Sequence, residues 1–240
     1  MSGYWNFAVS GAGSIGKLIV AGLLDGHKDL LDKGVKAVAV DYTSPPSLES
    51  ALSDIDVLVS TLRLLGIGHQ TALAMSAKAA GVKLFVPSDF RSDPRGQTQN
   101  PIFTQKVAIK QKLKELGLPY AIFYIGLFTE KVLVSNFAAA LGLNFATGEF
   151  SIPGSETADI SWTTARDVAQ FVVYALTAVP REKIKWRIED DRISLDELVS
   201  IWEKHSGKAA TVSHHPCTAF EAAVQKNPMD FISLFILANG

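Results

Sequence analysis

The sequence predicts an α/β fold with a doubly wound parallel sheet, and three observations support this prediction. Short apolar runs rich in β-branched residues alternate with longer helical stretches, the order that builds βαβ units. The short runs are apolar throughout, which is typical of strands covered by helices on both faces. A glycine-rich turn joins the first run to the first helical stretch. The 240 residues have room for one main domain and a small C-terminal lobe of mixed α+β structure.

The expected elements alternate along the first half of the chain. The strands are Asn6–Ser10, Val35–Val40, Val57–Thr61, Lys83–Pro87 and Tyr120–Ile125. The helices between them are Ser14–Leu24, Ser47–Leu52, Gln70–Ala80 and Phe103–Leu116. At least five strands are therefore expected to lie parallel in one sheet, with helices on both of its faces.

Beyond Phe128 the pattern is less regular. We expect a helix at Asp167–Leu176 and a strand at Ile184–Ile188. Ser194 and Glu197 have the spacing of a capping box, so a helix should begin there and run to about His205. The tail from Thr218 to Gly240 has a helical pattern, and its apolar run FISLFILA needs a surface that buries it.

Composition excludes several classes of protein. With 48% hydrophobic and 20% charged residues, the chain has enough apolar material for a core and does not resemble a disordered protein. The 23 basic and 24 acidic residues give a net charge of −1, which argues against nucleic acid and anionic membranes as partners. No apolar run reaches the ~18 residues of a membrane span. The single cysteine, Cys217, cannot form an internal disulfide, so we expect a reducing, cytoplasmic location.

The glycine-rich turn predicts a dinucleotide site. Gly11, Gly13 and Gly16 form G-x-G-x-x-G directly after a strand, and Ser14 and Ile15 open the helix that follows. In this context the first glycine permits a tight turn, the second lets a pyrophosphate approach the backbone, and the third lets the helix pack on the strand. The N-terminus of the helix attracts the anion.

The rest of the dinucleotide fingerprint is missing. A second strand should end in an acidic or basic residue for the ribose about 20 residues after the glycines, but Asp25–Gly34 is polar and strand-free. Asp32 has the right distance but a helical or loop context, and we do not assign it this role. Either the chain lacks the strand, or the sequence omits residues near Gly26–Lys28. Local chemistry therefore does not decide between NAD and NADP.

Several segments together resemble the NmrA-like and isoflavone reductase-like group of atypical short-chain dehydrogenases. They are the glycine turn, Gly34–Leu52, the segment Ala80–Phe90 with its VPSDF turn, and the lysine-bearing Phe103–Tyr120. The resemblance implies a Rossmann-type domain over residues 1–127 that binds NADP(H). It also implies a smaller substrate-binding lobe over residues 128–240, interleaved with the first.

The resemblance also implies roles for individual residues. Lys106 falls where the reductases carry the lysine that contacts the nicotinamide ribose and the substrate and assists proton transfer. Alternatively it is an ordinary surface lysine, like Lys110, Lys112 and Lys114 on the same helix. The remaining cofactor-binding residues that it implies are Ser60, Thr61 and Leu62 along the cleft, Ser88 and Phe90 beside the nicotinamide, and Asp41 and Tyr42 near the adenine. For Asp41, a role as a turn residue beside a helix is an open alternative.

Other chemistries find little support. None of the five tyrosines is followed by lysine four residues later, so the tyrosine–lysine pair of ordinary short-chain dehydrogenases is absent. No G-x-S-x-G sequence indicates a hydrolase. His214, His215 and Cys217 do not indicate a metal site, because adjacent histidines on a strand point to opposite faces and no second ligand cluster follows.

Two functions from different classes follow. The first is an NADP-dependent oxidoreductase that reduces a small aromatic or conjugated organic substrate, with Lys106 assisting hydride transfer. The second is a non-catalytic NADP(H)-sensing protein of the NmrA type that binds a regulatory protein partner. A shortened relative that binds no cofactor is a third reading.

Overall fold

The computed structural model describes residues 4–26, 35–91, 101–134, 136–153, 159–178, 185–227, 230, 233, 234 and 236. The chain divides into two compact units. The first comprises Met1–Phe90, Gln105–Tyr124 and Ala165–Ile188, and the second comprises Arg91–Thr104, Ile125–Thr164 and Glu189–Gly240. The division between a cofactor domain and a substrate lobe after residue 127 stays a prediction.

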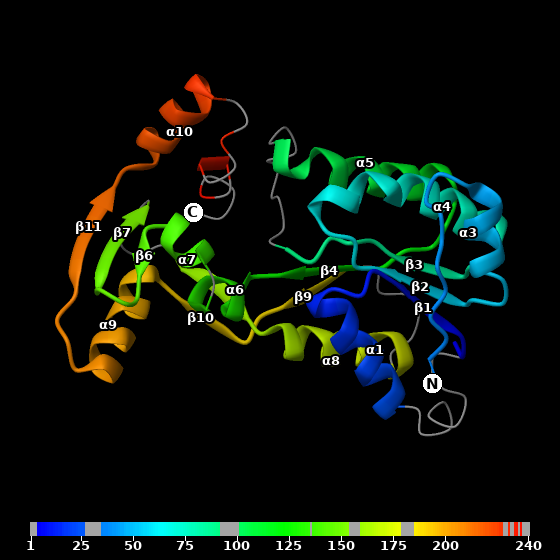
Figure 1. Cartoon of the computed structure of the whole chain (residues 1–240), viewed down its shortest axis with the longest axis horizontal. Helices are drawn as coiled ribbons and strands as arrows, with labels where there is room; N and C mark the ends of the chain where they lie inside the picture. The colour runs from blue at the N-terminus through cyan, green and yellow to red at the C-terminus, as the bar shows by residue number, and fades with distance from the viewer. Residues whose placement is uncertain are drawn as a thin grey trace. The chain divides into compact units, whose positions relative to one another are not determined.

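A parallel sheet forms the centre of the first unit (Figure 1). Its strands β1 (Phe7–Ser10), β2 (Val57–Ser60) and β3 (Leu84–Val86) pair in the order β1-β2-β3, with Phe7 opposite Val57 and Val57 opposite Leu84. Phe85 forms a further parallel bridge with Tyr120, just before β4 (Ile122–Ile125), and β4 pairs with β9 (Lys185–Ile188). The carboxyl ends of β1, β2 and β3 therefore meet at one edge of the sheet.

Helices cover both faces of this sheet, as Figure 1 shows. The helices α3 (Pro45–Ala51), α4 (Gln70–Ala79) and α5 (Pro101–Glu115) lie on one face, and α1 (Ser14–Gly26) and α8 (Ala165–Ala178) on the other. Leu58 and Phe85 of the sheet are packed with Leu73 of α4 and Leu113 of α5 in one buried cluster. On the opposite face Gly22 of α1 approaches Val173 of α8. The predicted doubly wound α/β fold is confirmed.

The strand predicted at Val35–Val40 is wrong. These residues form no strand, and Val35 and Val38 are 60% and 49% exposed. A strand needs a hydrogen-bonded neighbour, but among the described residues β1 pairs only with β2. Only the end of the segment, at Val40, packs on the core cluster. The predicted second-strand gap at Asp25–Gly34 falls largely on residues 27–34, which lie outside the described part of the chain.

The second unit mixes small sheets with short helices. One sheet has the order β10-β8-β5 and the other the order β11-β7-β6. The strands are β5 (Leu127–Phe128), β6 (Leu143–Asn144), β7 (Glu149–Pro153), β8 (Ile160–Thr163), β10 (Asp191–Ile193) and β11 (Thr211–His215), and the helices are α6 (Thr129–Val134), α7 (Asn136–Ala140), α9 (Leu195–Ser206) and α10 (Cys217–Lys226). Phe150, Trp162 and Leu198 lie in its buried cluster. This architecture confirms the expected α+β lobe.

The capping box at the start of α9 is confirmed. Ser194 Oγ accepts a hydrogen bond from the Glu197 N–H at 3.1 Å, and a Glu197 carboxylate oxygen accepts one from the Ser194 N–H at 2.8 Å. The tail is largely helical as expected: α10 ends at Lys226, Asn227 has an extended backbone, and Ser233, Leu234 and Ile236 are again helical. Of the apolar run, the described Leu234 and Ile236 are buried, as the run requires.

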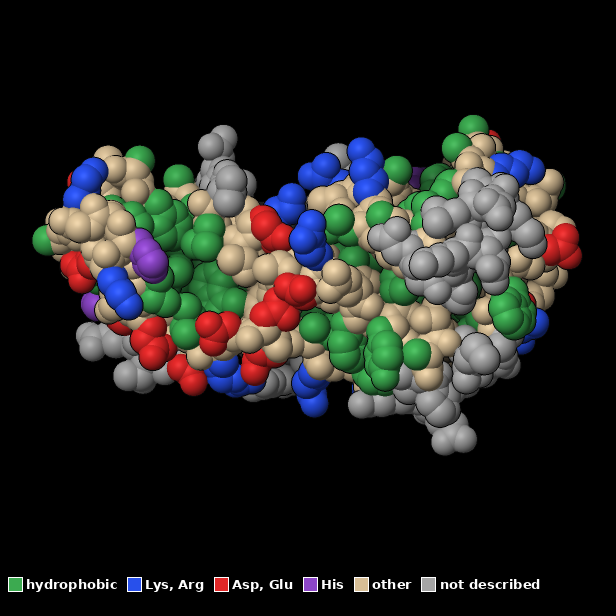
Figure 2. Space-filling view, turned by 90° about the horizontal axis from the view of Figure 1, so that it is seen from below, with side chains coloured by type: hydrophobic (Ala, Val, Ile, Leu, Met, Phe, Trp, Pro, Cys, Tyr) green, Lys and Arg blue, Asp and Glu red, His purple; other side chains and the backbone are tan. Residues whose placement is uncertain are grey.

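The surface carries charges of both signs. On the face seen in Figure 2, acidic and basic side chains are interspersed, in keeping with the net charge of −1. Within the described ranges, no helix has both the length and the apolar character that crossing a membrane requires.

A buried carboxylate secures the beginning of β1. Asp56 Oδ2 accepts hydrogen bonds from the backbone N–H groups of Trp5 and Asn6, at 2.9 and 3.2 Å, and Oδ1 lies 2.6 Å from Lys83 Nζ. Burial raises the pKa of Asp56, but the hydrogen bonds from Lys83 and from the two amides outweigh it and hold the pKa below 3.8. The ionised form is therefore the one that stabilises the fold.

We predict that Asp56→Asn lowers the free energy of unfolding at pH 7 by about 1–3 kcal/mol, because a charged acceptor of buried amides is lost. The folded-state pKa is depressed, so this stabilisation is present above the unfolded pKa of 3.8 and is lost as the pH falls through the folded value. Urea unfolding at pH 7 and pH 3 measures both effects. Asp54→Asn, at an exposed position with φ of 61° that suits asparagine, is the control. Equal pH dependence of Asp56→Asn and the parent protein would contradict the assignment.

Candidate functional site

The three glycines of the turn differ in how much space surrounds them. Gly11 has φ of +108°, and a Cβ there would lie 2.9 Å from Thr61 Oγ1. A Cβ on Gly16 would collide with the Gly11 carbonyl oxygen and Thr61 Oγ1. Around Gly13, by contrast, a Cβ would meet nothing within 4 Å. The first and third glycines thus allow close packing, and the second leaves the backbone open to a ligand, as a pyrophosphate cradle requires.

The end of β2 closes this cradle. The Thr61 N–H donates to the Ser10 carbonyl at 2.8 Å, and Thr61 Oγ1 donates to the Gly11 carbonyl at 2.7 Å. Ser14 and Ile15 follow at the N-terminus of α1, where backbone N–H groups have no partner within the helix and favour an anion. Ser60 is fully buried, and its Oγ has no hydrogen-bond partner among the described residues.

Asp41 and Tyr42 lie after the exposed segment that was expected to be a strand. The Asp41 carboxylate accepts hydrogen bonds from Thr43 Oγ1 and the Thr43 N–H, at 2.7 and 2.8 Å, and these bonds lower the pKa of Asp41. This is the geometry of a turn residue ahead of α3. Tyr42 OH lies 2.7 Å from Ser10 Oγ, and its ring lies 5.3 Å from that of His69. Tyr42 is thereby placed beside the end of β1, while the contact of either residue with an adenine stays a prediction.

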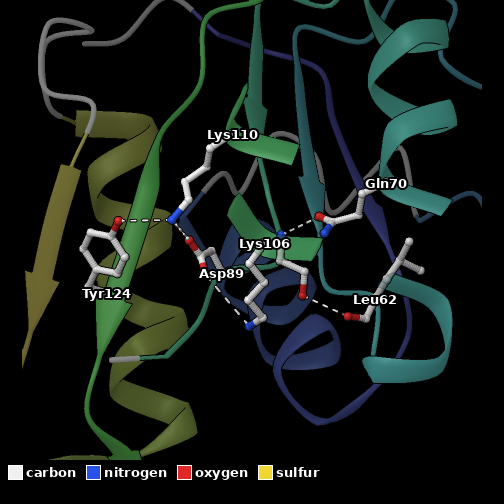
Figure 3. A network of polar contacts seen from close by, with 7 residues as sticks. Leu62, Gln70, Asp89, Lys106, Lys110 and Tyr124 are labelled. Atoms are coloured by element: carbon white, nitrogen blue, oxygen red, sulfur yellow. Dashed lines mark hydrogen bonds and ion pairs between the residues drawn. The ribbon is translucent and has the colours of Figure 1, made fainter. Parts of the chain in front are cut away.

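Ser88 links the ends of β2 and β3. Its N–H donates to Gln70 Oε1 at 2.7 Å, and its Oγ donates to the Leu62 carbonyl at 2.9 Å. Both bonds appear in Figure 3, with Gln70 coming from α4. Phe90 stacks on Phe123 with ring centroids 6.3 Å apart. Ser60, Thr61, Leu62 and Ser88 are therefore brought together at one edge of the sheet, as predicted for a cleft at strand ends.

Two lysines of α5 converge on the carboxylate next to Ser88. Asp89 is fully buried; Lys110 Nζ lies 3.0 Å from its Oδ2, and Lys106 Nζ lies 3.9 Å from its Oδ1 (Figure 3). The two lysine side chains are only 15% and 16% exposed, so neither is a solvated surface lysine. Lys110 Nζ also lies 3.4 Å from Tyr124 OH of β4. Asp89, Lys106 and Lys110 thus form one charge cluster, largely shielded from solvent, just after the end of β3.

Sequence reasoning missed two members of this cluster, Asp89 and Lys110, and the nearby Gln70. Asp89 was present in the VPSDF turn without a role, and Lys110 was taken for an ordinary surface lysine. The spacing of Lys106 and Lys110, one helical turn apart, was a signal that both point to one side of α5. Gln70 gave no signal, because a glutamine at the start of a helix is ordinary in sequence.

The histidines near the C-terminus lie in the second unit. His214 Nε2 is 3.0 Å from Asp196 Oδ1, and both side chains are about one third exposed. In the described ranges, no three His, Cys, Asp or Glu side chains gather as metal ligands would.

Comparison with known protein families gives a match that includes both the glycine turn and the lysine-bearing helix α5. The model of the family described as NmrA-like matches residues 11–239. The chain belongs to the NmrA-like family. This confirms the resemblance predicted from the sequence.

Three relatives illustrate the likeness. The chain is 27% identical to isoflavone reductase homolog P3 of Arabidopsis thaliana, over 95% of this chain and 75% of the relative. It is 25% identical to phenylcoumaran benzylic ether reductase TP7 of Nicotiana tabacum, with the same coverage. The solved binary complex of leucoanthocyanidin reductase and NADPH from Vitis vinifera superposes with a TM-score of 0.79 at 23% identity, covering 96% of this chain and 84% of that one. That structural likeness concerns the fold.

We predict that alanine at one turn glycine affects stability and alanine at another affects ligand binding. Gly16→Ala should lower the free energy of unfolding by about 1–3 kcal/mol, because its methyl group collides with backbone that cannot move away. Gly13→Ala should leave stability unchanged and weaken the binding of a dinucleotide, because its methyl group points into open space that a pyrophosphate would occupy. Urea unfolding and calorimetric titration separate the two effects. A stable Gly16→Ala protein would show that the turn is not packed as described.

Proposed function

We propose that this protein is an NADPH-dependent reductase of a small aromatic or conjugated organic substrate. The observation that carries the proposal is the convergence of the glycine cradle, the ends of β2 and β3, and the two largely shielded lysines at one edge of a parallel sheet. The reductases among the relatives are named for aromatic compounds and one was solved with NADPH, which supports both the cofactor and the substrate class.

The residues of the cradle fit a dinucleotide. Gly13 leaves the backbone open, and the N-terminus of α1 offers unpaired N–H groups to a pyrophosphate. Thr61 holds the Gly11 carbonyl by a hydrogen bond, which fixes the backbone of the turn. Tyr42 offers an aromatic ring near the adenosine end of such a ligand.

The chemistry divides between cofactor and protein. When bound, NADPH supplies a hydride to an electrophilic carbon of the substrate. The electron pair displaced from the reduced bond moves to the neighbouring atom, which takes a proton from the Lys106 ammonium group, and water returns the proton to the lysine. An ammonium group carries the proton that the acid role requires.

We predict that Lys106→Ala lowers kcat by about 10²–10⁴-fold, the usual contribution of a general acid, while NADPH affinity stays close to that of the parent. Oxidation of NADPH followed at 340 nm, with an isoflavone, a phenylcoumaran and a leucoanthocyanidin as trial substrates, measures the rate. Lys112→Ala, on the same helix but 33% exposed, is the control. Unchanged turnover in Lys106→Ala would remove this lysine from the mechanism.

We also predict that the protein binds NADPH in a calorimetric titration and binds NADH at least about tenfold more weakly. Binding of NADPH without turnover of any trial substrate would favour the alternative role of a non-catalytic NADP(H) sensor with a protein partner. Failure to bind either dinucleotide would contradict both roles.

A further inference from the structure

Gln70 is a buried polar residue that neither the family resemblance nor the proposed mechanism uses. It is the first residue of α4, and only 1% of it is exposed. Its Oε1 accepts the Ser88 N–H at 2.7 Å. Because that partner is a donor, the other amide atom must be Nε2, which has no hydrogen-bond partner among the described residues.

The hydrogen bond from Ser88 connects Gln70 to the charge cluster, because Ser88 directly precedes Asp89. Ser88 is fixed on two sides, by Gln70 through its N–H and by Leu62 through its Oγ. The next residue along the chain is Asp89, whose N–H donates to the Pro87 carbonyl at 2.7 Å. The position of this turn therefore decides where the Asp89 carboxylate lies, and with it the two ammonium groups that it attracts.

We propose that Gln70 is a positioning residue of the reductase site, which holds the Ser88–Asp89 turn and thereby sets the places of Lys106 and Lys110. The inference rests on the proposed function, in which Lys106 donates a proton. Gln70 itself touches neither lysine in Figure 3; it acts through Ser88 and Asp89.

The unpartnered Nε2 argues against a role in packing alone. A buried donor without an acceptor is unfavourable and uncommon in native proteins. Methionine has nearly the same length and would fill this place without that penalty. What glutamine offers here and methionine lacks is the acceptor oxygen that binds the Ser88 N–H.

Two substitutions separate the acceptor from the packing. Gln70→Met keeps the volume and removes the acceptor, whereas Gln70→Glu keeps an acceptor oxygen for the Ser88 N–H and removes the amide donor. Gln111→Met makes the same change at an exposed glutamine of α5 that bonds Glu115, and serves as the control. Thermal unfolding of each variant shows whether it folds.

The first readout does not depend on activity. In full-length protein carrying ¹³Cε-labelled lysine, the signals of Lys106 and Lys110 are assigned with Lys106→Arg and Lys110→Arg. Gln70→Met should move these two signals and leave that of Lys83, which pairs with Asp56, in place. Gln70→Glu should restore them toward the parent positions.

The second readout is the steady-state rate with NADPH and whichever trial substrate turns over. Gln70→Met should lower kcat by at least about tenfold with an unchanged KM for NADPH, because a small displacement of a reacting group is costly. Gln70→Glu should recover most of that loss. Rescue by Gln70→Glu, together with a shift confined to the signals of Lys106 and Lys110, supports the proposal.

The outcomes distinguish this proposal from the function on which it rests. Unmoved lysine signals in a folded Gln70→Met protein would overturn the positioning role. Lysine signals that move throughout the Gln70→Met protein, that of Lys83 included, would also overturn it and indicate a role in packing. Moved signals of Lys106 and Lys110 together with full turnover in Lys106→Ala would support the positioning role and remove the proton-donor role of Lys106.

Discussion

The site depends on the charge cluster of Asp89, Lys106 and Lys110. A carboxylate that is fully removed from solvent is strongly unfavourable unless opposite charges or donors compensate it. Lys110 at 3.0 Å and Lys106 at 3.9 Å provide that compensation, and both come from α5. The need to pair this charge therefore fixes α5 against the end of β3, and the same contact brings two cations to the edge of the sheet where a cofactor cleft is expected.

The cradle and the charge cluster are connected through hydrogen bonds at successive strand ends. Thr61 ties the end of β2 to the glycine turn after β1, and Ser88 ties the end of β3 to Leu62, directly after Thr61. Each link joins neighbouring strands whose register is fixed by the parallel ladder. A displacement at one strand end would thus be passed to the next, which is why polar residues at these ends matter although few of them would touch a ligand.

Sequence reasoning succeeded where the signal is local. The glycine turn, the capping box of Ser194 and Glu197 and the lysine helix depend on residues within a few positions of one another, and the structure has each of them. It failed at Val35–Val40, because an apolar run becomes a strand only if a neighbour in space pairs with it. It also missed Lys110 and Gln70, since their roles come from Asp89 and Ser88, which are distant in sequence and meet them only in the folded chain.

The departure at the second strand affects one end of the proposed site more than the other. Between α1 and β2 the described residues contain no strand, so no residue of such a strand is placed to select the ribose or its 2′-phosphate. The pyrophosphate cradle is built from β1, α1 and Thr61 alone. The charge cluster is built from the end of β3 and from α5, with Gln70 of α4 behind it. Beside the end of β1, the rings of Tyr42 and His69 lie together. The charge cluster, by contrast, does not involve the second strand, because Lys106 and Lys110 pair with the Asp89 carboxylate from α5.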